Sequence, residues 1–221
     1  IQDAGLNMLY CGIESGSDEV LEKIRKGVTA EKIINASLKG KNAGMNLVVF
    51  VIFGLGGKEL SVTHVDETAK VLNQIDPYNI RVMSLAVKGE TGLNQMIADR
   101  SFTMLSETQM VEEQKRLIEQ LEGIRSLYSN SHTVNLLNEI VGQFPDDKTR
   151  LLNIIDGFLS LTEEDKLNFI LGKRLGYYYR LTDLENSNIY KVVQGQLAQI
   201  SGQQSAESFE TFFHNLRNRV I

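Results

Sequence analysis

The sequence predicts an α/β fold: a partial (β/α) barrel with three parallel strands, followed by an all-helical C-terminal region. Strand-like and helix-like segments alternate over the first part of the chain, and the connections between strands are too long for hairpins. This order is typical of right-handed parallel βαβ units. After about residue 92 the pattern changes to amphipathic helices. We therefore expect an α/β region at residues 1–104 and a helical domain at residues 105–221.

The first strand is expected at residues 6–13, an apolar run that reads "LNMLYCGI". A short helix should follow at residues 18–27, because Ser17 is a suitable N-cap, acidic residues occupy the first turn and Gly27 can end the helix. A second helix is expected at residues 29–44 on the same grounds.

The second strand is predicted at residues 46–57, where "NLVVFVIFGLGG" is continuously apolar. Such runs are typical of parallel strands that are buried on both faces. A helix at residues 61–74 and a third strand at residues 79–87 complete the α/β region.

The helical region starts at residues 106–123, where Ser106 and Gln109 have the spacing of a capping box. Four further amphipathic segments follow it, at residues 145–161, 162–175, 188–200 and 206–220.

Composition excludes several functional classes. The 221 residues carry a net charge of −5, which argues against broad nucleic-acid binding. No apolar run is long enough to cross a membrane. Cys11 is the single cysteine, so an intramolecular disulfide is impossible and a reducing, cytoplasmic location is favoured.

Some short motifs carry no functional prediction. "GLGGKE" fails the phosphate-loop spacing because Lys58 is followed by Glu59, and "GIESG" does not centre its serine between glycines as a nucleophile elbow does. His64, His132 and His214 lack metal-ligand spacing, so structural roles are favoured, with a substrate-pocket role as the alternative for His64.

A composite pattern is more informative. The first strand ends in "GIESGS" (12–17), Lys26 follows just before a glycine, and the second strand ends in "FGLGG" (53–57). Over residues 6–87 this pattern resembles the second half of the barrel of the radical S-adenosylmethionine (radical SAM) superfamily. The resemblance implies iron–sulfur, metal-binding oxidoreductases that cleave SAM reductively and abstract hydrogen from a substrate through a 5′-deoxyadenosyl radical.

The resemblance also implies SAM contacts at the strand ends. Glu14 suits the ribose hydroxyls or the ammonium group, Ser15 can serve either group, and Lys26 suits the SAM carboxylate. Taken without the resemblance, Glu14 could interact with a helix dipole, and Lys26 could be a solvated charge at a helix end.

The adenine contacts are expected on the second and third strands. Gly54, Leu55 and Gly56 leave room for the ring to lie on the backbone, with Ile52 as an apolar floor. Main-chain groups of Leu85 can meet the adenine edge.

A finer resemblance extends into the helical region. "SNSH" (129–132) with Asn135, and "PDDK" (145–148) with "ID" (155–156), are similar to stretches of bacterial Fe–S oxidoreductases related to oxygen-independent coproporphyrinogen III oxidase. The inserted Ser131 departs from that pattern and leaves the role of His132 open.

The family holds a [4Fe–4S] cluster by three cysteines, and this chain has one. We therefore expect no cluster, metal ligand or catalytic residue in this chain, which begins at Ile1 and would be an inactive C-terminal fragment of a longer enzyme. Its partners would be an unknown small-molecule substrate and either the N-terminal half of the barrel or a second copy.

Two other classes of protein stay open. One is a non-catalytic half-barrel scaffold or protein-interaction module. The other is a generic enzyme such as an aldolase-like barrel, which is disfavoured because no lysine lies at the end of an apolar strand.

Overall fold

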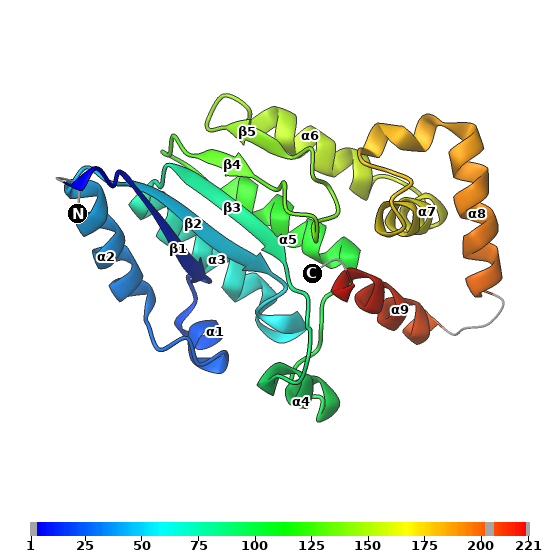
Figure 1. Cartoon of the computed structure of the whole chain (residues 1–221), viewed down its shortest axis with the longest axis horizontal. Helices are drawn as coiled ribbons and strands as arrows, with labels where there is room; N and C mark the ends of the chain where they lie inside the picture. Colours follow the sequence, from blue (N-terminus) through cyan, green and yellow to red (C-terminus); the bar gives the residue numbers. More distant parts are fainter. Residues whose placement is uncertain (1–3, 202–205, 220–221) are drawn as a thin grey trace.

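The computed structural model describes residues 4–201 and 206–219. Its centre is a mixed sheet of five strands in the order β1-β2-β3-β4-β5 (Figure 1). β1 to β4 are parallel to their neighbours, and β5 is antiparallel to β4. The strands are β1 (Met8–Glu14), β2 (Asn46–Phe53), β3 (Asn79–Ser84), β4 (Leu127–Ser129) and β5 (Val141–Gln143).

Helices connect and extend these strands. The first five are α1 (Asp18–Lys23), α2 (Ala30–Asn42), α3 (Gly57–Ile75), α4 (Gly92–Ala98) and α5 (Glu107–Gln120). The later ones are α6 (Lys148–Leu159), α7 (Glu163–Arg174), α8 (Ser187–Ser201) and α9 (Ala206–Asn218), with a 3₁₀ turn η2 (Leu181–Glu185) before α8.

The α/β class is confirmed, but two parts of the fold prediction were wrong. The sheet has five strands, not three, and the region after residue 104 is not all-helical. β4 and β5 have three residues each, and a run this short has no recognisable period. Their place is fixed by pairing, because β4 adds to β3 in parallel from Asn79 and Leu127 onward.

Local signals explain the helix starts. Ser17 accepts a hydrogen bond from the amide of Val20, as its prediction as an N-cap required. Ser106 and Gln109 form the predicted capping box at the start of α5. α4 was not predicted; it is a short helix that begins after Thr91 and buries none of its residues.

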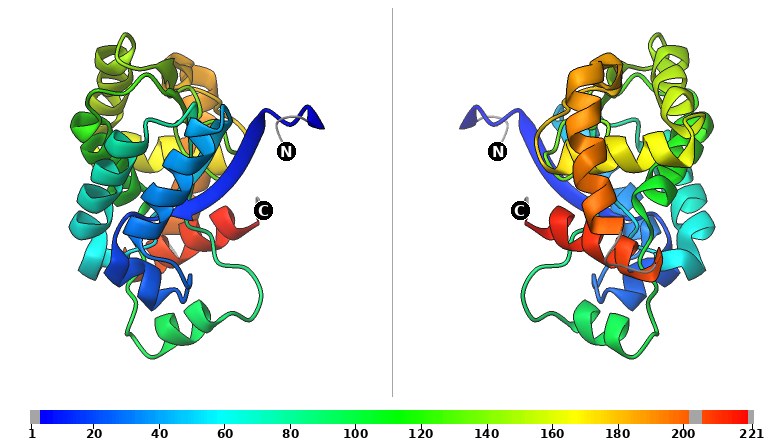
Figure 2. Two further views of the ribbon diagram at one scale, coloured as in Figure 1. Left: turned by 90° about the vertical axis from the view of Figure 1, so that its left-hand side faces the viewer. Right: turned by 90° about the vertical axis from the view of Figure 1, so that its right-hand side faces the viewer.

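The sheet has one face covered by helices. α2, α3, α5 and α6 lie behind it, and Figure 2 shows β1 projecting on the opposite side. Val49, Val51 and Phe53 of β2 point into this helical layer and are buried. Buried apolar residues from both predicted regions form one continuous core, and the division at residue 104 stays a prediction.

The other face of the sheet is less covered. Tyr10 of β1 is 63% exposed and lies 6.3 Å from the ring of Phe50, which also lies beneath the guanidinium of Arg81. Among the strands that the structure describes, β1 lies at one edge of the sheet and pairs with β2. Within the described part of the chain, no helix combines the length and the apolar character needed to cross a membrane.

Candidate functional site

Two loops rich in glycine lie side by side at the C-terminal edge of the sheet. The first glycine loop (residues 12–17) ends β1, and the second glycine loop (residues 53–57) ends β2. They are neighbours because β1 and β2 are parallel, with Glu14 paired to Val51 after a register shift. Ligands bind to parallel sheets at this edge.

Glu14 and Lys26 form an ion pair beside the first glycine loop. Glu14 has a left-handed backbone (φ 63°), and its Oε1 lies 3.0 Å from Nζ of Lys26. The side chains are 20% and 31% exposed, respectively, so a solute can reach both. Gly12 makes room for this arrangement, since a Cβ there would lie 2.2 Å from Oε1 of Glu14.

Ser15 lies on the other side of the strand and is fully buried. Its hydroxyl donates to Nδ1 of His64 (2.8 Å) and accepts from the amide of Ser17 (3.0 Å). The donor assignment follows from Nε2 of His64, which must donate to the carbonyl of Ile52 (3.1 Å). The Ser15 hydroxyl is therefore used within the chain.

His64 on α3 joins the first glycine loop to β2, just before the second glycine loop. It is fully buried, and this burial lowers its pKa to about 4, so the imidazole is neutral near pH 7. The hydrogen bond to Ile52 opposes this shift. Thr68, one helical turn later, accepts from the amide of Gly16 (2.8 Å).

The second glycine loop is held by Glu113 on α5. Oε2 accepts from the amide of Gly54 (2.6 Å), and Oε1 accepts from the hydroxyl of Ser61 (2.7 Å). Burial raises the pKa of Glu113 to about 7, against the effect of these two hydrogen bonds. Position 54 requires a glycine, because its φ of +82° is a conformation that other residues rarely adopt.

The predicted adenine contacts lie around a small apolar cluster. Leu55 and Leu85 are buried in this cluster, and Ile52 packs against it. Gly56 packs against α3, where a Cβ would lie 2.9 Å from the backbone of Leu60. The amide of Leu85 already donates to the carbonyl of Phe53 (2.8 Å), which leaves its carbonyl as the group for an adenine edge.

A hollow of about 740 Å³ opens beside Leu55. Its other walls include Phe102 and Met96, and Lys23 and Arg25 supply positive charge. Nζ of Lys23 lies 5.3 Å above the ring of Phe102. The hollow combines an apolar floor with cations, a composition that suits an aromatic ring carrying an anionic group.

The "SNSH…N" stretch forms the connection between β4 and β5. Asn135 accepts from the amide of Ser84 (2.7 Å) and donates to the carbonyl of Val82 (2.8 Å), so its side chain replaces a strand partner at the end of β3. Nδ1 of His132 accepts from the amide of Val134 (3.2 Å). These contacts stabilise the loop itself.

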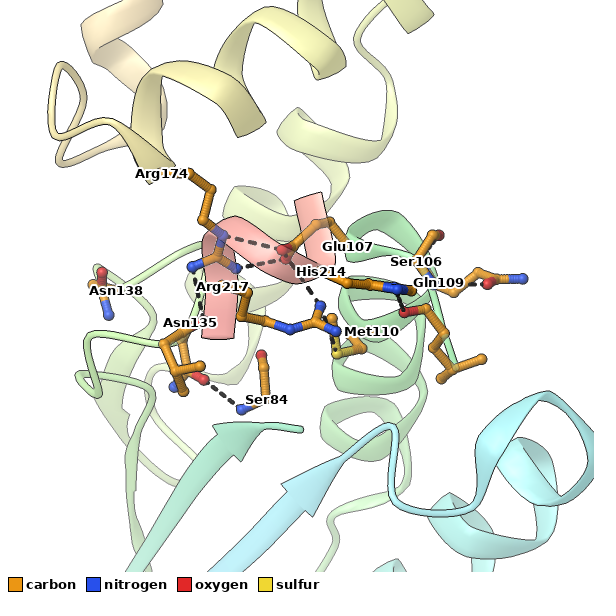
Figure 3. A network of polar contacts seen from close by, with 12 residues as sticks. Ser84, Ser106, Glu107, Gln109, Met110, Asn135, Asn138, Arg174, His214 and Arg217 are labelled. Carbon is orange, nitrogen blue, oxygen red and sulfur yellow. Dashed lines mark hydrogen bonds and ion pairs between the residues drawn. The ribbon is translucent and has the colours of Figure 1, made fainter. Parts of the chain in front are cut away.

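A buried ion cluster lies next to the end of β3 (Figure 3). It consists of Glu107, Arg174 and Arg217, with His214 beside it. Burial by itself raises the pKa of Glu107. The charges of the two arginines together lower the pKa by more than burial raises it, so the net shift is downward. Burial also lowers the pKa of His214.

The donor set for an iron–sulfur cluster does not fit this chain. Cys11 is half-buried on β1, and among the described residues no three His, Cys, Asp or Glu side chains are grouped to hold a metal ion. A [4Fe–4S] cluster with three cysteine ligands therefore has no site here.

Comparison with known proteins gives no family: no protein-family model matches the chain, and no curated protein matches it significantly.

Sequence reasoning missed Glu113 and the buried ion cluster. Glu107 and Glu113 belong to a helix with many charged residues, "ETQMVEEQKRLIEQ", and the pattern does not separate buried from exposed carboxylates. One signal was present: Glu113 falls on the same side of α5 as the buried Met110 and Leu117.

Proposed function

We propose that this chain is the C-terminal part of a radical SAM iron–sulfur enzyme and that it contributes SAM contacts. The observation that carries the proposal is the pairing of Glu14 and Lys26 at the first glycine loop, beside the second glycine loop. An accessible carboxylate and an accessible ammonium at this edge match the two charged ends of an amino acid.

In this proposal Glu14 binds the ribose hydroxyls or the ammonium of SAM, and Lys26 binds its carboxylate. Gly54, Leu55 and Gly56 face the adenine, with the carbonyl of Leu85 at its edge. Ile52 forms the apolar floor beneath the adenine. Ser15 acts from behind, because through His64 it links the first glycine loop to the carbonyl of Ile52 on β2. SAM, when bound next to a reduced cluster in the intact protein, supplies the radical chemistry.

The sheet supports the proposed barrel segment. β1 to β4 are parallel and follow the chain order, and the helices α2, α3 and α5 cover one face. The N-terminal half of the barrel would pair with the free edge of β1 and bring the cluster cysteines. We place the intact enzyme in the cytoplasm, where its thiols would stay reduced.

SAM binding to the chain tests the proposal. We expect weak, saturable binding in ligand-observed NMR, and Glu14→Gln and Lys26→Met should each weaken it about tenfold because each removes one charged contact. Lys166→Met is the matched control, since Lys166 forms an i,i+3 pair with Glu163 on α7, outside both loops. Binding that neither Glu14→Gln nor Lys26→Met affects, or no binding at all, would contradict the proposal.

Reconstitution with iron and sulfide tests the proposed division of labour. The chain alone should show no cluster absorbance and no SAM cleavage, because it contributes one thiol. Cluster formation in the isolated chain would show that the missing cysteines are not required.

A second candidate is a non-catalytic scaffold. It is favoured by the exposed Tyr10 and by the unpaired edge of β1, which offers main-chain groups to another strand. This function predicts a dimer in light scattering that Tyr10→Lys disrupts. A monomer that binds SAM would exclude it.

A further inference from the structure

The buried ion cluster contains more positive than negative charge. Glu107 is its carboxylate, and Arg174 and Arg217 are its two guanidinium groups; all three side chains are at most 3% exposed. His214 does not offset this positive charge, because an imidazole is either neutral or positive. Its Nε2 donates to the carbonyl of Leu105 (3.1 Å). Positive charge of this kind is normally matched by an anion when it is buried.

Arg174 shows how the carboxylate is used. Its Nε and Nη2 lie 3.0 Å and 2.6 Å from the two oxygens of Glu107, so one edge of the guanidinium binds the carboxylate bidentately. Its Nη1 donates to the carbonyl of Val134 (2.9 Å). Arg174 thus has partners on both sides, and Glu107 accepts two strong hydrogen bonds from it.

Arg217 is fully buried, but it is only partly satisfied. Its Nη1 lies 3.3 Å from Oε1 of Glu107 and 3.6 Å from Sδ of Met110. Its Nε and Nη2 have no hydrogen-bond partner in the part of the chain that the structure describes. These two nitrogens form the same edge that Arg174 uses to bind a carboxylate.

The position of Arg217 relates this edge to the functional end of the sheet. α9 lies at the ends of the strands, where Asn218 accepts from the amide of Val87 (2.9 Å). In Figure 3 the guanidinium of Arg217 lies beside Met110, between Glu107 and Ser84 at the end of β3. A small hollow of about 10 Å³ adjoins the cluster; Ser84, Glu107 and Met110 are among the residues that line it, and Arg217 lies behind this lining.

We propose that the Nε/Nη2 edge of Arg217 binds a carboxylate of a molecule that occupies the C-terminal edge of the sheet. The planar, two-donor edge matches a carboxylate, as Arg174 and Glu107 demonstrate within the same cluster. The added negative charge would balance the two guanidinium groups. The hollow has room for about one water, so formate, the smallest carboxylate, is the first probe, and its binding requires the side chains around the hollow to move apart.

The inference rests on the proposed function in one respect. We identify the molecule that Arg217 binds as the substrate of the SAM site, which predicts a substrate with a carboxylate. The binding of a carboxylate to Arg217 itself requires neither SAM nor the cluster.

The test is a titration of the whole chain with sodium formate, followed through the arginine Nε–H signals in ¹H–¹⁵N NMR spectra. The Arg217 signal is assigned from its loss in Arg217→Lys or, if that variant does not fold, from through-bond spectra of the unaltered chain. We expect a saturable shift of the Arg217 signal and little change at Arg174, whose Nε–H is already bonded. Sodium chloride at the same ionic strength is the control.

Formate should also raise the melting temperature of the chain, and Arg217→Lys should abolish that increase because lysine lacks the two-donor edge. Arg116→Lys, which alters an exposed bidentate pair with Asp66, is the matched control and should keep the increase. An unchanged Arg217 signal, an equal response to chloride, or a response to phosphate but not to formate would overturn the proposal.

Larger carboxylates then separate the free ion from a substrate group. Succinate that shifts the Arg217 signal together with the amides of Gly54 and Gly56 supports a substrate that extends to the glycine loops, whereas a shift confined to formate overturns the link to a substrate. If SAM binding fails while formate binds, the proposed function is wrong and the Arg217 site remains.

Discussion

The two glycine loops lie side by side, yet they are held in place by different chemistry. The first glycine loop is anchored by neutral groups, through the hydrogen bond of Ser15 to His64 and that of Gly16 to Thr68. The second is anchored by a carboxyl group, that of Glu113. Both anchors lie on the buried side of the sheet, whereas Glu14 and Lys26 are accessible to a solute.

The two anchors should respond to pH in opposite ways. Burial moves both pKa values, but it lowers that of the base His64 and raises that of the acid Glu113, since in each case it disfavours the charged form. Acid should therefore destabilise the folded chain through His64, and base should destabilise it through Glu113.

The largest expected effect is at Gly16, the glycine through which the first loop touches α3. A Cβ there would lie 2.4 Å from the carbonyl oxygen of Glu67 and 2.6 Å from Cα of Thr68. Because both contacts are with backbone, we expect Gly16→Ala to lower the free energy of unfolding by about 3 kcal/mol. Gly56→Ala, with its nearest contact at 2.9 Å, should cost less, about 1 to 2 kcal/mol.

Urea denaturation measures both effects. Gly92→Ala is the control, since a Cβ at Gly92 has no atom within 4 Å. Equal losses at Gly16 and Gly56 would show that the loops are packed against α3 equally tightly, contrary to the structure.

The next effect concerns the pH dependence of stability. The pKa of Glu113 rises from 4.5 to about 7 on folding, so its contribution is present below pH 4.5 and is lost as the pH rises through 7. The pKa of His64 falls from 6.5 to about 4, so its contribution is present above pH 6.5 and is lost as the pH falls through 4. Each shift corresponds to up to about 3 kcal/mol.

The two slopes oppose each other in wild type, and single substitutions should expose them. Relative to wild type, Glu113→Gln should gain stability as the pH rises between 4.5 and 7, whereas His64→Gln should gain as it falls between 6.5 and 4. Unfolding free energies from urea titrations across this range measure both changes. Glu112→Gln, on the exposed side of α5, is the matched control, and slopes of the same sign would refute the assignment.

The sequence was most informative where a pattern is long. The strands β1, β2 and β3 and the helix α2 overlap their predicted ranges, because apolar runs of six residues or more can be recognised. β2 ends at Phe53, before the predicted residue 57, since Gly57 already begins α3. β4 and β5 could not be predicted from the sequence, since strands of three residues form only through the neighbours they pair with. The cap of β3 by Asn135 is of the same kind, because it joins residues that are far apart in the chain.

The candidate site follows the same division. Glu14 and the glycine loops could be placed at one edge from strand order alone, whereas Lys26 was placed there by the resemblance. The burial of Ser15 could not, because the direction of its side chain depends on the shift in register between Gly12 and Glu14. Arg217 could not either, since its partner Glu107 lies more than a hundred residues earlier.

The smallest effect on the free energy of unfolding is expected at Gly12, where a substitution should instead weaken SAM binding. A Cβ there would meet Oε1 of Glu14 at 2.2 Å, but this contact is with the end of a partly exposed side chain that can move away. We expect Gly12→Ala to change the free energy of unfolding by less than about 1 kcal/mol. The displaced carboxylate should nevertheless lose its 3.0 Å contact with Lys26, and SAM binding should weaken about as much as in Glu14→Gln. Parallel urea and NMR titrations separate the two effects, and full SAM affinity in Gly12→Ala would show that the Glu14–Lys26 geometry is not what the ligand needs.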